Sequence, residues 1–113
     1  MAHKFSKKDG GKIDKSQAET WVKKYRDKHK DAVRAYFFGT DLIDTIIHQE
    51  GAVGMRIYLA YGDEKDPATK EDRLQMVLVG VKEDGTVMWP TEVGKDNPGP
   101  TAGDQGVPCP PYC

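Results

Sequence analysis

Two apolar runs decide the fold of this chain: Met55-Arg56-Ile57-Tyr58-Leu59-Ala60-Tyr61 and Leu74-Gln75-Met76-Val77-Leu78-Val79-Gly80-Val81. β-Branched and aromatic residues fit a pleated surface, so both runs are predicted to be strands. In the first run the apolar side chains at odd positions share one face, because side chains alternate along a strand. The second run is apolar on both faces from Met76 to Val79, which is typical of a central strand covered on both sides.

The residues before these runs predict two helices. Ser16-Gln17-Ala18-Glu19 has the pattern of a capping box at the start of the first. Its apolar residues then follow the three-and-four spacing of one helix face. They are Ala18, Trp21, Val22, Tyr25, His29, Ala32, Val33 and Tyr36. Gly39 ends this pattern, and Thr40 is a candidate N-cap for a second, short helix that buries Leu42, Ile43, Ile46 and Ile47.

After the second strand, Asp84-Gly85 predicts a turn, and residues 86–89 are predicted to be a third, antiparallel strand. From Thr91 onward Gly, Pro, Asp and Asn dominate, which is typical of an extended tail. The predicted fold class is α+β: two N-terminal helices packed on a small, mainly antiparallel sheet of about three strands, with an extended Gly/Pro-rich C-terminal tail. The expected divisions are a flexible lead-in at 1–15, an α+β domain at 16–90 and the tail at 91–113.

The composition is that of one small soluble domain, with 113 residues, 37% hydrophobic and 31% charged. A domain the size of residues 16–90 buries only roughly 60% of its unfolded surface, so its stability is expected to be modest or to depend on a partner. The second strand also needs a cover on its outer face, which the tail or a second copy of the chain would provide. We therefore expect self-association or a protein partner.

The net charge of −1 hides an asymmetry. Residues 1–34 contain 11 Lys and Arg and 5 Asp and Glu, a formal charge of +6, whereas residues 35–113 contain 6 and 13, a charge of −7. A basic half can meet nucleic acid or an anionic surface. No aromatic residues interleave with the lysines in a binding pattern, so the lysines are interpreted as a solvated helix face and nucleic-acid binding is not expected.

The expected location is the cytoplasm. No apolar run is long enough to span a bilayer, so no membrane association is expected. No apolar segment follows the basic residues at the N-terminus, as it would in a secretory signal. A cytosolic setting disfavours a permanent disulfide.

Both cysteines lie in the closing Pro108-Cys109-Pro110-Pro111-Tyr112-Cys113. In polyproline II geometry their Cα atoms are roughly 12 Å apart, whereas a disulfide needs less than about 7 Å. A bridge between Cys109 and Cys113 therefore demands a tight turn or a cis proline. The alternatives are exposed or packing thiols, redox or intersubunit disulfide chemistry, and a zinc site formed by the two thiolates and further ligands, for example the thiolates of a second chain.

His48, Arg56 and Tyr58 are the candidate residues of a small enzyme with a pocket between helices and sheet. His48 can act as a base or ligand, although a histidine at that position more often interacts with the last carbonyls of a helix. Arg56 is expected to pair with a loop carboxylate such as Asp63 or Asp72, or else to bind an anionic ligand. No phosphate-loop, dinucleotide or nucleophile-elbow pattern occurs, so no catalytic or cofactor-binding residue is assigned.

Three motifs taken together resemble those of small uncharacterised bacterial proteins: Gly54-Met55-Arg56-Ile57-Tyr58, Leu78-Val79-Gly80-Val81 with Asp84-Gly85, and the closing Cys-Pro-Pro-x-Cys. The resemblance covers the sheet and the tail. It implies a bacterial cytosolic setting and brings no activity, cofactor or site residue.

The leading functional hypothesis is a non-enzymatic protein-interaction or assembly module, with the C-terminal tail as one contact element. Its basis is the small core, the long tail and the absence of a motif that names a reaction. One alternative is a thiol or zinc-binding protein that acts through Cys109 and Cys113. A second alternative is the small enzyme that uses His48, Arg56 and Tyr58, and enzymatic activity is therefore left open.

Overall fold

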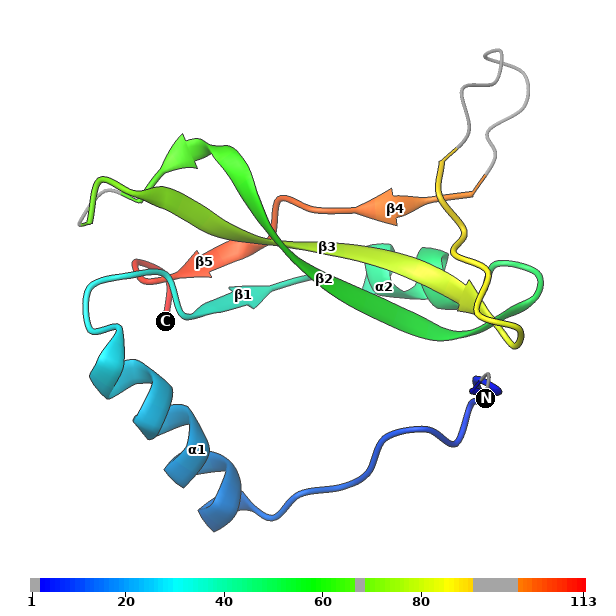
Figure 1. Cartoon of the computed structure of the whole chain (residues 1–113), viewed down its shortest axis with the longest axis horizontal. Coiled ribbons are helices and arrows are strands. Elements are labelled where there is room, and N and C mark those ends of the chain that lie inside the picture. Colours follow the sequence, from blue (N-terminus) through cyan, green and yellow to red (C-terminus); the bar gives the residue numbers. More distant parts are fainter. Residues whose placement is uncertain (1–2, 67–68, 91–99) are drawn as a thin grey trace.

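The computed structural model describes residues 3–66, 69–90 and 100–113 (Figure 1). Its elements follow in the order α1 (Lys15–Lys28), β1 (Ala35–Phe37), α2 (Thr40–Ile47), β2 (Ala52–Lys65), β3 (Asp72–Lys82), β4 (Ala102–Gly103) and β5 (Val107–Cys109). β2, β3 and β4 form one antiparallel sheet in that order, and β1 and β5 form a second antiparallel sheet. The chain end thus returns to the body of the molecule and contributes one strand to each sheet.

The β2–β3 hairpin contains both apolar runs of the sequence. The predicted strands at 55–61 and 74–81 lie within β2 and β3, which are 14 and 11 residues long. Ile57 lies opposite Leu78, and Tyr58 lies opposite Val77. Because opposed residues of an antiparallel pair share a face, the odd-numbered side chains of β2 lie on the face that also carries Leu78.

The predicted architecture, two N-terminal helices packed on a single sheet with an extended tail, is wrong. The described residues form five strands in two antiparallel sheets, and strand exceeds helix, 34% against 22%. β1 lies between the two helices, and residues 100–113 are not a tail that leaves the domain, because they include β4 and β5, which pair with β3 and β1. The predicted third strand at 86–89 is reduced to one antiparallel bridge between Val87 and Val81.

Helix α1 ends earlier than the apolar spacing predicts. Its N-cap is Asp14, whose carboxylate accepts the Gln17 N–H at 2.8 Å, so the predicted capping box at Ser16 lies inside the helix. The helical spacing continues beyond Lys28, but Tyr36 lies in β1, opposite Pro108 of β5. A strand partner at the far end of the chain leaves no trace in a local spacing pattern, and this is the reason for the error.

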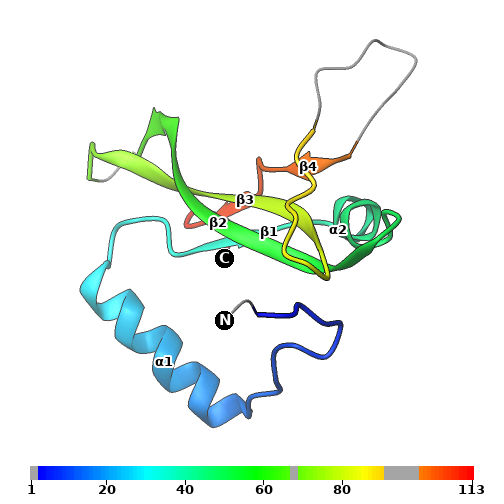
Figure 2. The ribbon, with the colours of Figure 1, turned by 45° about the vertical axis from the view of Figure 1, so that its right-hand side comes forward.

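The core includes both faces of β3: Leu78 shares the face of Gly103, which contacts α2, and its neighbour Val79 points to the opposite face. Ile46, Leu78 and Val79 are its fully buried large side chains. A Cβ at Gly103 would lie 2.6 Å from the Leu42 side chain, so a larger residue there would require Leu42 of α2 to shift. Figure 2 shows α2 beside the hairpin, with α1 at the other end of the molecule. No helix in the described residues is long and apolar enough to cross a membrane.

Candidate functional site

Helix α1 carries an apolar face that the described part of the chain leaves open. Trp21 is 57% exposed, Val22 60% and Tyr25 43%. No residue of α1 is buried. The sequence predicted that this face would pack on the sheet, and the structure instead places it in contact with solvent.

These three side chains line one wall of a groove of about 390 Å³. The other wall is formed by Arg34, Ala35 and Cys109, at the start of β1 and the end of β5. The groove is therefore bounded by segments from both ends of the chain. Trp, Tyr and Arg are the residue types enriched among those that dominate the energy of protein–protein contacts.

Pairing between β1 and β5 positions the second wall. Ala35 lies opposite Cys109, and the Arg34 N–H donates to the Cys109 carbonyl at 2.8 Å. The Tyr112 N–H donates to the Pro108 carbonyl at 3.0 Å and closes the terminal turn. These bonds hold the end of the tail on β1, so the tail is part of the groove.

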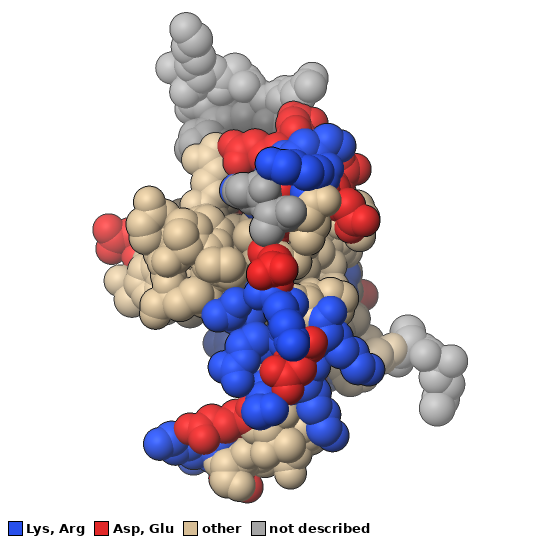
Figure 3. All heavy atoms as spheres, turned by 90° about the vertical axis from the view of Figure 1, so that its left-hand side faces the viewer, with Lys and Arg blue, Asp and Glu red and all other residues tan. Residues whose placement is uncertain are grey.

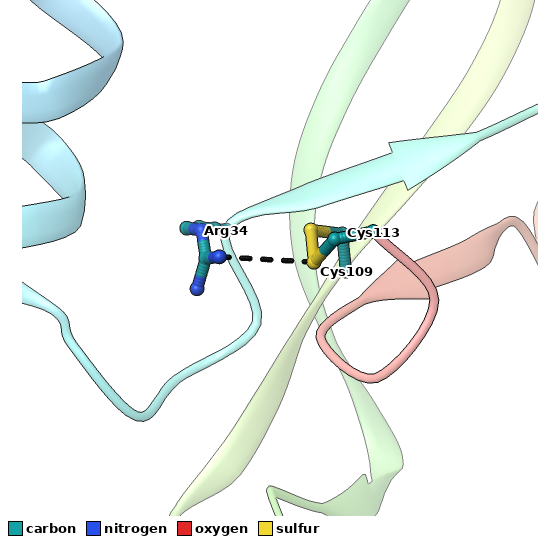
Figure 4. The surroundings of a disulfide bond; sticks show 3 residues. All are labelled: Arg34, Cys109 and Cys113. Atoms are coloured by element: carbon teal, nitrogen blue, oxygen red, sulfur yellow. Dashed lines mark hydrogen bonds between the residues drawn. A yellow bond between two sulfur atoms is a disulfide. The ribbon is translucent and has the colours of Figure 1, made fainter.

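Cys109 and Cys113 form a disulfide, with their Cα atoms 4.8 Å apart (Figure 4). The Cys109–Pro110 and Pro110–Pro111 peptide bonds are both cis, so the segment is not in the extended geometry that would keep the cysteines apart. The Arg34 guanidinium points at the bridge, with Nη2 3.7 Å from Cys113 Sγ. A cation beside one sulfur of a disulfide is the arrangement that favours a thiolate there after reduction.

The disulfide determines when Cys109 and Cys113 are able to bind zinc. Zinc binds thiolates, so a site at Cys109 and Cys113 requires the reduced chain. Across residues 3–66, 69–90 and 100–113, no three His, Cys, Asp or Glu side chains are grouped as a metal site. Zinc binding by the reduced pair, with further ligands from a second chain, stays a prediction.

Asp66 joins the segment between α1 and β1 to the hairpin. Its carboxylate accepts the Val33 N–H at 3.0 Å and the Thr69 N–H at 3.2 Å. Asp66 is only 4% exposed and Val33 only 5%. The link between α1 and β1 is thereby joined to the tip of the β2–β3 hairpin.

Tyr36 attaches the two-stranded sheet to β3. Its hydroxyl donates to the Leu74 carbonyl at 2.6 Å. Burial raises the pKa of the Tyr36 hydroxyl above its ordinary value, so the neutral donor form is favoured. Through this bond the wall of the groove that includes β1 is held against the larger sheet.

The groove lies beside a basic surface. Figure 3 shows Lys and Arg side chains gathered over α1, below a mixed group that is rich in Asp and Glu. At the hairpin tip, Lys65 pairs with Asp72, and Arg73 pairs with Glu64 at 2.7 Å. A partner that fills the groove would therefore meet an excess of positive charge along α1.

The structure separates His48 from Arg56 and Tyr58. His48 is exposed at the end of α2, where its Nδ1 lies 3.0 Å from the Asp44 carbonyl. Arg56 Nη1 donates to the Tyr58 hydroxyl at 3.2 Å, and its guanidinium lies 5.3 Å from the Phe5 ring centroid. The pocket that contains Arg56 is not lined by His48. The expected pairing of Arg56 with a loop carboxylate is not among the described ion pairs, in which Asp72 binds Lys65.

Sequence reasoning assigned no functional role to three residues of this region: Trp21, which it placed on a helix face that packs on the sheet, Arg34 and Asp66. The available signal for Asp66 was its place before a proline, which is typical of a turn whose side chain accepts backbone N–H groups. No local signal marked Arg34, because its neighbour Cys113 lies at the other end of the chain.

Comparison of the chain with protein-family models, with curated proteins and with solved structures finds no match.

Proposed function

We propose that this chain is a non-enzymatic protein-interaction module whose contact surface is the groove between α1 and the β1–β5 sheet. The observation that carries the proposal is the open apolar face of α1, with Trp21, Val22 and Tyr25 all more than 40% exposed. Soluble proteins seldom leave a contiguous apolar patch open unless it contacts another molecule. The Cys109 end of the tail lines the same groove, in keeping with the tail as a contact element.

The aromatic residues of the groove supply enough apolar area for a useful contact. A Trp or Tyr side chain offers on the order of 150–250 Å². If a partner covers about 100 Å² of each, the gain is about 2.5 kcal/mol per ring at 25 cal/mol per Å². Arg34 at the opposite wall and the lysines of α1 favour a partner segment with an apolar anchor and acidic flanks.

A phage-displayed library of random peptides tests the proposal even though the partner is unidentified. Peptides selected on the purified protein are expected to carry an apolar anchor with acidic neighbours. Their binding is expected to be lost in Trp21→Ala and retained in Thr20→Ala, a change on the opposite, exposed face of the same helix. A selection in which no peptide depends on Trp21 would contradict the proposal.

The Arg34–Cys113 contact favours a second candidate function, thiol–disulfide exchange with a dithiol partner. A partner thiolate attacks Cys109 Sγ, a mixed disulfide forms, and Cys113 leaves as a thiolate beside Arg34. The partner's second thiolate then attacks the partner's sulfur atom that is bonded to Cys109. The partner's disulfide forms, and Cys109 leaves as a thiolate. The partner leaves oxidised to a disulfide, and the cysteine pair has gained two electrons.

Reduction by dithiothreitol tests this second candidate. Arg34→Ala is expected to slow the loss of the disulfide, because Cys113 becomes a poorer leaving group, and Arg34→Lys is expected to restore part of the rate. Alkylation followed by mass measurement counts the free thiols. Equal rates in all three proteins would remove Arg34 from the chemistry.

Cytoplasmic location, the likeness to small bacterial proteins and the lack of nucleic-acid binding remain part of the proposal. Cytosolic thiols are kept reduced, and disulfides that form there are usually transient. The redox state of Cys109 and Cys113 in cells therefore reports on the compartment. A pair that stays fully bridged in growing cells would argue against the cytoplasm.

A further inference from the structure

Strand β2 leaves one long edge of the larger sheet free. It spans Ala52–Lys65, lies at the end of the β2–β3–β4 order and pairs with β3 alone. Within the described residues, the backbone of 55–61 has no hydrogen bond to any segment except β3. An unpaired strand edge is a template for a further strand.

The middle of this edge lacks the features that usually prevent such pairing. Natural edge strands are blocked by charged side chains, prolines or bulges. Residues 57–62 contain neither charge nor proline, and the two irregularities lie at the ends, between Ala52 and Gly54 and between Tyr61 and Lys65. Ile57 is 51% exposed, Leu59 69% and Tyr61 73%, so an apolar row lies open beside the free edge.

We infer that the free edge of β2 pairs antiparallel with β2 of a second copy of this chain, about a two-fold axis at Tyr58. This pairing joins the two larger sheets into one continuous sheet. The inference deepens the proposed interaction role, and it uses a surface other than the groove.

The register follows from the side chains. Pairing about Tyr58 sets Ile57 opposite the partner's Leu59 and Met55 opposite the partner's Tyr61, so the apolar rows meet. An axis at Leu59 would set Met55 opposite the partner's Asp63. An axis at Ile57 would set Tyr61 opposite the partner's Val53, inside the irregular end of the strand. A register shifted by one residue would pair odd-numbered with even-numbered positions of β2, so the apolar side chains of the two copies would lie on opposite faces of the joined sheet.

The same register explains why a second copy fits the edge. A two-fold contact requires a surface that is complementary to itself. In this register no two like charges lie opposite one another, because Arg56 faces the partner's Ala60 and Glu64 faces the partner's Ala52. Arg56 is also held on its own chain by Phe5 and Tyr58.

Light scattering coupled to size-exclusion chromatography tests the inference on the intact chain. The wild type is expected to have twice the 12.6 kDa mass of one chain at micromolar concentrations. Leu59→Lys is expected to shift the measured mass to that of one chain. In each copy a charged lysine would then lie opposite the partner's Ile57, in the middle of the apolar contact. Tyr112→Lys, an equivalent change at a residue of the C-terminal turn that is 71% exposed and outside β2, is expected to remain a dimer.

A cysteine pair tests the register independently of Leu59→Lys folding. Ile57→Cys and Leu59→Cys proteins, mixed and mildly oxidised, are expected to give a cross-linked heterodimer in preference to either homodimer. A wild type that is a single chain throughout the micromolar range, or a dimer that survives Leu59→Lys, would overturn the inference. Neither result bears on the peptide selection at Trp21, so the two proposals fail separately.

Discussion

Val33 donates its backbone N–H to the carboxylate of Asp66 at 3.0 Å, and both residues are buried. The carboxylate also accepts the Thr69 N–H at 3.2 Å. One side chain thus joins the link after α1 to the tip of the β2–β3 hairpin. The joint matters for function because the segment that it holds leads directly into β1, which forms part of one wall of the groove.

Asp66→Ala is expected to lower the free energy of unfolding by about 1–3 kcal/mol, because it leaves the buried Val33 N–H without its acceptor. Urea unfolding followed by circular dichroism measures the change. Asp63→Ala, at an exposed position of the same hairpin, serves as the control and is expected to have little effect. An equal loss in the two variants would mean that the Asp66 joint does not hold the link.

Trp21→Ala is expected to change the free energy of unfolding by less than about 0.5 kcal/mol, because the side chain is exposed. Leu78→Ala, in the core, is expected to cost about 2–5 kcal/mol. The comparison is made by urea unfolding at a concentration where the protein is a single species. A large loss of stability in Trp21→Ala would show that α1 packs on its own sheet, and its apolar face would then not be available to a partner.

Tyr36→Phe is expected to cost about 0.5–1.5 kcal/mol, because the bond to the Leu74 carbonyl is lost. The pKa of Tyr36 is raised in the folded chain by burial. Its contribution to stability is therefore present below the unfolded pKa, near 10, and is lost as the pH rises through the higher folded value. Thermal melts at increasing alkaline pH should show a smaller decline in Tyr36→Phe than in the wild type. Parallel declines would exclude this role for Tyr36.

Replacement of both Cys109 and Cys113 by Ser is expected to destabilise the chain by roughly 2 kcal/mol, which is the chain-entropy contribution of so short a loop. A reductant should weaken the wild type by a similar amount and leave the double variant unchanged. Thermal melts with and without reductant provide the measurement. A wild type that is insensitive to reductant would show that β5 stays on β1 without the bridge.

The strands with the strongest local pattern were predictable, and the contacts between chain ends were not. Alternation and apolar character marked residues 55–61 and 74–81, because a strand in a long hairpin finds its partner nearby. β1 and β5 are three residues each, and they pair with one another although they lie far apart in the sequence. Such short segments acquire their conformation from pairing, so Tyr36 remained part of a predicted helix.

For the candidate site, the sequence indicated which residue types were of interest but not how they are arranged. The cysteines were recognised, together with the tight turn or cis proline that a bridge requires, but the choice among thiol, metal and disulfide stayed open. Trp21 and Tyr25 were recognised as an apolar face, and the assumption that every apolar face is covered by its own chain placed them in the core. A pattern of spacing identifies such a face, but it does not say whether the cover comes from the same molecule.

Native mass spectrometry of the purified protein, prepared without reductant or chelator, most directly tests the claim that the chain assembles through β2. We predict a species of two chains, twice 12.6 kDa, which loses one chain in Leu59→Lys and contains one internal disulfide in each chain. A single chain at every micromolar concentration would contradict assembly through β2. A zinc-loaded species without the disulfide would instead support the alternative in which Cys109 and Cys113 bind zinc.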